Sequence, residues 1–275
     1  MNSSTPPTVA ALAERLDNAD GARPALVAAE RPERVPLSSA QRRLWFLNRL
    51  DGPNSTYNIP FALRLHGTLD ETALRGALQD LTRRHEPLRT LFPSVAGEPY
   101  QHILPAEQVT VALETFEATE EELAGRLAEA ARHEYDLTTE TPLRAALYRL
   151  APDEHVLFVL LHHIAGDGWS LAPLTRDLAA AYAARRDGGE PDWPALPVSY
   201  ADYTLWQRDL LGDQDDPSGL YGKQLAYWAE NLAGIPEHLE LPTDHARPAV
   251  SDHRGETVPF HIAPRAPPAP DRAGP

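Results

Sequence analysis

The 275-residue sequence contains no cysteine, only one methionine, and far fewer basic than acidic residues. Without cysteine there is no disulfide framework, no thiol nucleophile and no cysteine-ligated zinc, which is typical of a reducing compartment. The 25 lysines and arginines stand against 40 aspartates and glutamates, which gives a formal net charge of −15. Because so acidic a chain repels nucleic-acid backbones and anionic lipid, we expect neither as a partner.

Long apolar runs are also absent. No stretch of the sequence reaches the roughly 18 apolar residues that a membrane helix needs. The first residues lack the basic and apolar regions of a secretory signal. We therefore expect a cytoplasmic protein without a membrane partner, whose 42% hydrophobic residues are enough for an ordinary globular core.

Prolines and hydrophobic periodicity divide the chain into segments. Residues 8–16 predict a short helix, and residues 22–36 an extended linker that cannot build a core. Further helices are expected over 40–50, 70–85, 119–130, 169–186, 199–211 and 222–233, and strands over 57–65, 88–92, 99–104, 109–116, 143–150, 155–162 and 257–262. This alternation predicts an α/β fold in which a mixed sheet packs against flanking helices. The strand at 155–162 is almost wholly apolar, so it should be central in that sheet.

A cluster of polar residues and glycines, HHIAGDG, follows this apolar strand at positions 162–168. Because strand side chains alternate, one of His162 and His163 should face a cleft while the other points the opposite way. Asp167 can hold the loop through an ion pair or backbone hydrogen bonds. Gly166 and Gly168 permit a tight turn and leave backbone N–H groups free to approach a reacting oxygen.

Two other interpretations of this cluster have less support. Both histidines could be core residues that bond to the backbone beside a glycine-rich turn. His162, His163 and Asp167 could instead bind a metal, but adjacent histidines on a strand diverge and no further ligands are evident, so we expect no metal.

The segment HHIAGDGWS resembles the HHxxxDG signature of the condensation domains of nonribosomal peptide synthetases, which belong to the chloramphenicol-acetyltransferase-like superfamily. Other segments match further motifs of this family in the right order. They are PLSSAQRRLWFL at 36–47, YNIP at 57–60, RHEPLRT at 84–90 and SYADYTLWQ at 199–207. The wording of the first motif and of DGWS resembles the subtype that joins two L-configured residues.

The resemblance extends over residues 35–262 and covers only the first of the family's two lobes and its crossover. It implies a chloramphenicol-acetyltransferase-like N-terminal lobe at 36–190, then crossover helices and the start of a second lobe with a proline-rich tail at 191–275. Residues 1–20 resemble the terminal helix of a carrier domain, and 21–35 form the linker. Because the second lobe is missing, we expect the chain alone to be inactive.

The resemblance implies that the family's reaction is peptide-bond formation. The amine of an aminoacyl group on an acceptor carrier domain attacks the thioester on a donor carrier domain. His163 would take a proton from this amine or orient it, and the N–H of Gly168 would approach the oxyanion. No cofactor is expected, because the substrates arrive on the 4′-phosphopantetheine arms of the carriers. A second chain or a downstream lobe is a further expected partner.

The remaining residues of the motifs are expected to be structural. His162 would pack beneath the loop, and Asp167 would pair with an arginine, for which Arg84, Arg89 and Arg254 are the candidates. Trp169 is expected to be a packing anchor. The helix at 199–211 should bury its aromatic residues Tyr200, Tyr203 and Trp206 in the core.

Two alternative functions stay open at this point. One is an O-acyltransferase of the same superfamily that depends on coenzyme A or a carrier, in which His163 would deprotonate a hydroxyl group. The other is a non-catalytic fragment that only folds or docks. The motifs at 36–47 and 199–207 favour amide formation over the first alternative, whereas the length of the chain favours the second for this chain alone.

Overall fold

The computed structural model describes residues 8, 23–52, 54–236, 239, 242–246, 260 and 261. The chain divides into two compact units, Met1–Ala233 and Gly234–Pro275, and the elements below all belong to the first. The predicted helix at 8–16, the predicted strand at 257–262 and the proline-rich tail lie almost entirely outside the described residues.

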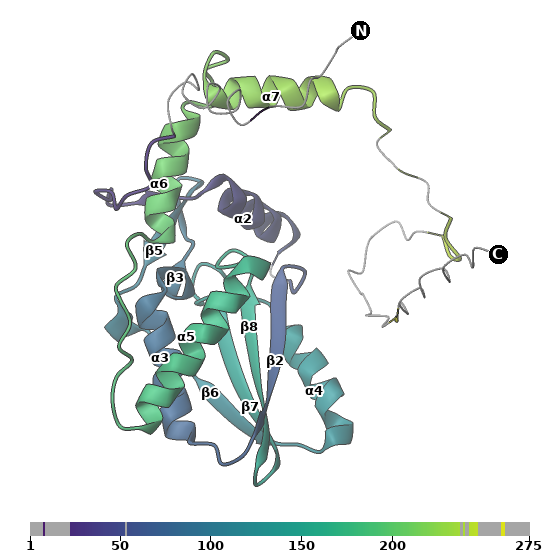
Figure 1. Ribbon diagram of the computed structural model, residues 1–275. Coiled ribbons are helices and arrows are strands. Elements are labelled where there is room, and N and C mark those ends of the chain that lie inside the picture. Colours follow the sequence, from purple (N-terminus) through teal and green to yellow (C-terminus); the bar gives the residue numbers. More distant parts are fainter. Residues whose placement is uncertain are drawn as a thin grey trace, which may run out of the picture. The chain divides into compact units, whose positions relative to one another are not determined.

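The helices and the longer strands follow one another in the predicted order (Figure 1), whereas the two-residue strands Val35–Pro36 and Ser94–Val95 were not predicted. The α-helices are α2 (Ser39–Asp51), α3 (Glu71–Arg84), α4 (Glu120–Ala131), α5 (Gly168–Arg186), α6 (Tyr200–Leu211) and α7 (Leu220–Asn231). The strands are β1 (Val35–Pro36), β2 (Asn58–His66), β3 (Thr90–Leu91), β4 (Ser94–Val95), β5 (Glu98–Ile103), β6 (Leu113–Glu117), β7 (Leu143–Ala151) and β8 (Glu154–His162). Two short 3-10 turns are η1 (Glu86–Arg89) and η2 (Ala106–Gln108).

Two predicted strands begin later than expected. The strand placed at 88–92 starts only at Thr90, because Pro87 lies in the first turn of η1, where a fixed φ and a missing N–H are tolerated. The strand placed at 109–116 starts at Leu113 after η2. Helix starts were more predictable, since Asp70 and Thr119 each accept a backbone hydrogen bond in the first turn of their helices.

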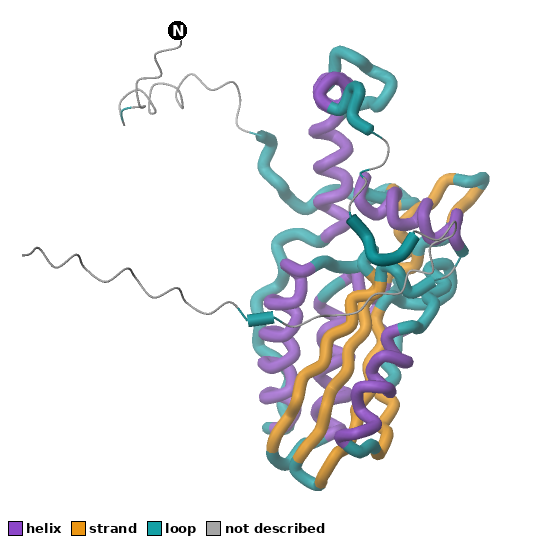
Figure 2. Tube along the Cα trace, turned by 90° about the vertical axis from the view of Figure 1, so that its right-hand side faces the viewer, coloured by secondary structure: helices purple, strands orange, loops and turns teal. Residues whose placement is uncertain are grey.

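The main sheet is mixed, as predicted, with strand order β2-β8-β7-β6. Strand β8 is central and antiparallel to both β2 and β7, whereas β6 lies parallel to β7. Eight of the nine residues of β8 are buried. Figure 2 shows the strands of this sheet between helices on either side, so β8 is covered on both faces.

The two faces of the sheet pack into two different cores. On one face, Leu157, Val159 and Leu161 of β8 contact the apolar sides of α3 and α5. On the other face, Val156, Phe158 and Leu160 contact α4, α2 and the segment that carries Tyr135 and Leu137. The period of two along β8 therefore assigns residues 156–161 alternately to one core and the other.

Helices α3 and α5 are joined by reciprocal ion pairs between buried carboxylates and arginines. Asp80 of α3, 2% exposed, accepts two hydrogen bonds of 2.7 Å from Arg185 of α5. In return, Asp177 of α5 accepts hydrogen bonds of 2.9 Å from Arg84 Nε and from His85 Nε2. Although burial alone would raise the pKa of Asp177, the hydrogen bonds from Arg84, His85 and Arg176 lower it. The carboxylate is thus held in its charged form between the two helices.

The predicted linker is extended but is not a free tether. The indole of Trp206 in α6 donates a 2.7 Å hydrogen bond to the Pro24 carbonyl. Further along, Arg31 contacts the carboxylates of Glu86 and Asp202 and donates to the hydroxyl of Ser199. A segment without a core of its own is therefore fastened to α6, which sequence patterning did not reveal. We call residues 23–31 the strap.

Removing the charge of Asp177 is expected to destabilise the fold, because the Arg84 guanidinium, only 10% exposed, would lose its counter-charge. We expect Asp177→Asn to lower the free energy of unfolding by about 3 kcal/mol, measured by urea denaturation. The matched control is Glu98→Gln, whose pair with Arg42 is largely exposed and contributes less than about 1 kcal/mol. Equal denaturation midpoints for the two variants would contradict this reading.

Candidate functional site

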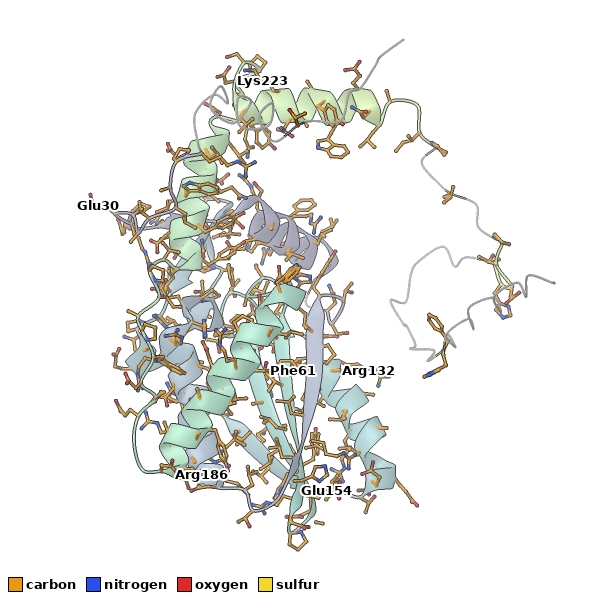
Figure 3. The ribbon with its side chains drawn as sticks, in the orientation of Figure 1. Glu30, Phe61, Arg132, Glu154, Arg186 and Lys223 are labelled. Carbon is orange, nitrogen blue, oxygen red and sulfur yellow. The ribbon has the colours of Figure 1, made fainter. Side chains whose placement is uncertain are left out.

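The HHIAGDG segment lies where the C-terminal end of β8, the first residues of β2 and the N-terminus of α5 meet. Asn58, the first residue of β2, pairs with His162, the last residue of β8. Helix α5 begins at Gly168, after a five-residue loop. In Figure 3, the labelled Glu154 marks the opposite end of β8.

His162 is buried, with 1% of its surface exposed. Its Nδ1 accepts a 3.1 Å hydrogen bond from the N–H of Ile164, so the neutral ring carries its proton on Nε2. Burial, and secondarily the neighbouring His163, lower the pKa of His162 to about 4. A neutral, enclosed imidazole is suited to bracing the loop, and it is not placed to exchange protons with solvent near neutral pH.

His163 is exposed, as strand alternation predicts for the neighbour of a buried histidine. Its backbone N–H donates a 2.8 Å hydrogen bond to the carbonyl of Tyr57, which immediately precedes β2. The backbone of His163 is therefore fixed by the edge strand, while its side chain can reach a molecule outside the lobe.

Asp167 caps helix α5 and has no arginine partner among the described residues. Its Oδ1 accepts hydrogen bonds from the N–H (3.1 Å) and the hydroxyl (2.9 Å) of Ser170, whose Oγ accepts from the N–H of Asp167. This reciprocal capping box closes the loop onto the helix. Asp167 thus holds the loop, but through a helix cap.

The expected pairing of Asp167 with Arg84 or Arg89 is wrong. Arg84 is engaged by Asp177 and the Pro194 carbonyl, and it lies over the ring of Trp193. Arg89 donates to the backbone carbonyls of Thr82 and Leu104. Both arginines act at the C-terminal end of α3 and in the η1 turn that follows it. The third candidate, Arg254, lies outside the described residues.

Neither Gly166 nor Gly168 has a positive φ, so neither is needed here for a left-handed backbone. A Cβ on Gly166 would lie 3.2 Å from the Ser170 Cβ, so this glycine permits a close approach. A Cβ on Gly168 would meet nothing within 4 Å. The N–H of Gly168, in the first turn of α5, has no acceptor within the described part of the chain. The start of α5 therefore presents an open space and a free donor.

The segment below His162 was missed by the sequence analysis. Tyr135 is fully buried, its hydroxyl donates to the Leu160 carbonyl (2.9 Å), and its ring meets the His162 ring edge-on at 5.8 Å. Asn58, within the YNIP motif, donates from Nδ2 to the carbonyls of Ala131 and His133, each at 2.8 Å. The YNIP motif was the one available signal for this contact, but it gave no indication of what the asparagine touches.

Two expectations about aromatic residues are also wrong. Trp169, predicted to be a packing anchor, is 90% exposed because it lies in the first turn of α5, beyond the end of the sheet. Tyr200, Tyr203 and Trp206 are only half-buried and stack in succession along α6, with ring centroids 5.3 and 5.9 Å apart. Trp206 bonds the strap at Pro24 and Tyr200 bonds Ser38 at the start of α2, and none of the three belongs to the sheet's two cores.

The described residues contain no group of three or more side chains able to hold a metal ion. They also contain no helix of sufficient length and apolarity to cross a membrane.

The buried His162 is expected to make the fold sensitive to mild acid. The unfolded chain binds a proton with the ordinary pKa of 6.5, whereas the folded chain does so only near 4. Between these values acid favours the unfolded state, by up to about 3 kcal/mol at the lower end. In urea denaturation from pH 7 to pH 4, His162→Asn, whose Oδ1 can replace Nδ1 as acceptor, should lose less stability than the parent protein.

The comparison with the parent removes the contribution of other groups, such as His85, whose pKa is also lowered by burial. Identical pH profiles for the parent and the variant would show that His162 is not the buried neutral group described above.

Three comparisons with known proteins agree on the family of this chain. The family model described as "Condensation domain" matches residues 32–267. The chain is 57% identical over 258 residues to a dimodular nonribosomal peptide synthase of Bacillus subtilis (strain 168), an alignment that covers 94% of this chain and 11% of the synthase. The chain thus spans about a tenth of the length of this curated relative.

Solved structures show the same fold. The X-domain from teicoplanin biosynthesis, solved in complex with OxyB, has a TM-score of 0.76 and 44% identity, over 84% of this chain and 50% of that one. The first condensation domain of the CDA synthetase has a TM-score of 0.64 at 24% identity, over 76% of this chain and 53% of that one, and supports the fold alone. The mixed sheet, the HHIAGDG loop at its edge and these matches agree, and the chain belongs to the condensation-domain family of nonribosomal peptide synthetases.

Proposed function

We propose that this chain supplies the catalytic half of a condensation domain, which joins a carrier-bound donor thioester to a carrier-bound aminoacyl acceptor. The observation that carries the proposal is that one five-residue loop begins with the exposed His163 and ends at the free backbone N–H of Gly168 in α5, and that His162 holds this loop through Ile164. Family membership supports the reaction class. The expected cytoplasmic location follows from this role and stays a prediction.

In the proposed reaction the acceptor amine attacks the carbonyl carbon of the donor thioester. The C–N bond forms, the C–S bond breaks, and the proton lost by the amine passes to the departing thiolate. His163 lies where it can accept the amine proton or hold the amine by a hydrogen bond. Because an amine attacks a thioester readily, orientation supplies much of the rate.

The oxygen of the thioester gains negative charge during this attack. We propose that the N–H of Gly168, together with the positive end of the α5 dipole, stabilises that oxyanion. The open space beside Gly168 leaves room for the reacting carbonyl. His162 and Asp167 contribute by fixing the loop through their bonds to Ile164 and Ser170.

The partners follow from this chemistry. The substrates would arrive as thioesters on the 4′-phosphopantetheine arms of a donor and an acceptor carrier domain, and no bound cofactor takes part. The chain covers about half of each solved structure reported above. We propose that a second lobe, in the same chain or another, completes the cleft. The exposed aromatic ring of Trp169, six residues after His163, marks a surface that this lobe would cover.

The first test is amide formation from loaded donor and acceptor carriers, measured as single-turnover product. We expect no product above background from this chain alone and clear product once the second lobe is supplied. His163→Ala should then lower the rate by about 10²–10⁴-fold. The matched control is His66→Ala, which removes an exposed histidine at the opposite end of β2. A near-parental rate for His163→Ala would refute the assignment.

The same assay distinguishes the alternatives. An acceptor with a hydroxyl in place of the amine should be a poor substrate, and its preferential use would indicate an O-acyltransferase instead. Donors that end in an L residue should react in preference to D donors if the chain is of the L-to-L subtype. A chain that gives no product with any lobe or acceptor would be the non-catalytic fragment.

The second test isolates the backbone donor of Gly168. Proline fits the first position of a helix, and the extended backbone of Asp167 (φ −139°, ψ −171°) is compatible with a following proline. Gly168→Pro replaces the N–H with a ring carbon, so we expect a rate lower by about 10²–10³-fold, and the melting temperature reports whether the fold is kept. Gly168→Ala keeps the N–H and is the control. If the two variants react equally fast, the N–H has no catalytic role.

A further inference from the structure

The side-chain amide of Asn58 uses its nitrogen but not its oxygen for hydrogen bonding. Both of its hydrogens are engaged, since Nδ2 donates to the carbonyls of Ala131 and His133 at 2.8 Å each. Its Oδ1 is buried and has no partner. A rotated amide would place Oδ1 against two carbonyl oxygens, so the observed orientation is the favourable one.

The two carbonyls belong to the C-terminal end of helix α4. Ala131 is the last residue of this helix and His133 follows its cap, so neither carbonyl has a partner from the helix itself. Asn58 satisfies both from another element of the fold. The exit of the chain from α4 is thereby fixed against the first residue of β2.

This exit leads directly to the support of the site. Two residues after His133, Tyr135 bonds to the Leu160 carbonyl of β8 and sets its ring edge-on to His162. The His133 ring in turn meets Tyr135 edge-on at 4.7 Å, and its Nε2 lies 2.7 Å from Glu140. The turn from Ala131 to Tyr135 therefore supports the buried His162 through the Tyr135 ring.

The backbone next to Asn58 holds the other histidine. The carbonyl of Tyr57 accepts the N–H of His163, and Asn58 pairs with His162 across β2 and β8. Tyr57 thus holds His163 directly, by a backbone hydrogen bond. Asn58 acts on His162 indirectly, by fixing the turn after α4 that carries Tyr135. A buried oxygen without a partner lowers the stability of the fold. The two hydrogen bonds that Asn58 donates are therefore the contribution that an asparagine makes at this position.

We propose that Asn58 is a positioning residue, whose amide locks the Ala131–Tyr135 turn beneath His162 and so fixes the direction in which His163 presents its imidazole. The proposal rests on the catalytic role of His163 proposed above. It concerns geometry that can be measured without turnover.

The test is the nuclear magnetic resonance of the histidine rings in this 275-residue chain. In the parent protein His162 should be the neutral tautomer protonated at Nε2. Asn58→Ala frees the turn, so water reaches His162, its titration midpoint should rise by about one pH unit, and the His163 resonances should move. Asn58→Ser keeps one donor and should give a smaller shift. The control Asn231→Ala removes a similar 2.8 Å amide-to-carbonyl bond, in α7, and should change neither ring.

Unchanged resonances of both histidines in a folded Asn58→Ala protein would overturn the proposal, as would equal shifts in the control. Should neither Asn58 variant fold, the parent protein decides, because both Nδ2 hydrogens of Asn58 must be protected from exchange with solvent. Fast exchange of these hydrogens contradicts the proposed lock.

A kinetic arm separates positioning from folding. In a condensation domain that contains both lobes, Asn58→Ala should lower kcat by about 10-fold or more with little change in KM for the acceptor carrier, because misaligned groups lose rate before they lose binding. Asn231→Ala should leave both constants unchanged. If the parent domain makes no amide, the proposed function fails while the resonance test of Asn58 still gives its answer.

Discussion

The register of β8 between β2 and β7 is the constraint on which the rest of the lobe depends. Because side chains alternate, a slip by one residue would exchange the sets of residues that enter the two cores, and it would exchange the environments of His162 and His163 as well. Both cores are large and apolar, so the same packing that stabilises the sheet also decides which histidine is enclosed. The packing of the two cores thus determines the orientation of both histidines at the C-terminal end of β8.

Polar groups then fix the position of helix α5, which the packing of the sheet alone does not determine. Helix α5 carries the cap residue Asp167 at one end, and further along it is tied to α3 by the Asp80–Arg185 and Asp177–Arg84 pairs. These pairs do not touch the site, but they prevent α5 from sliding on α3. Of the RHE residues at 84–86, Arg84 and His85 both bind Asp177 of α5, whereas Glu86 binds Arg31 of the strap. These three residues of the motif thus hold elements of the lobe together.

Most of the fold could be predicted from the sequence. For the site, the sequence predicted features that depend on neighbouring residues, but not the contacts between distant segments. The apolar run of β8 and the caps at Asp70 and Thr119 act locally, so pattern and propensity predicted them. The partner of Arg84 could not be predicted, because Asp177 lies 93 residues away and is one of 40 acidic residues in the chain. Asp167 was misjudged for the opposite reason: its partner, Ser170, is only three positions away. The role of Tyr135 depends on its contacts with β8, which lies 25 residues away in sequence and which no local pattern encodes.

The strap gives the lobe a property that its globular part does not have. If residues 23–34 were free, a domain joined ahead of them would hang from β1 on 12 residues, with a reach of about 40 Å when fully extended. Fastened at Pro24 and Arg31, the chain instead leaves the lobe beside α6, and that length no longer adds to the reach. The volume searched by such a domain shrinks with its tether, and its effective concentration near the lobe rises. If such a domain were present, the hydrogen bonds between the strap and α6 would therefore raise the frequency with which it meets the lobe.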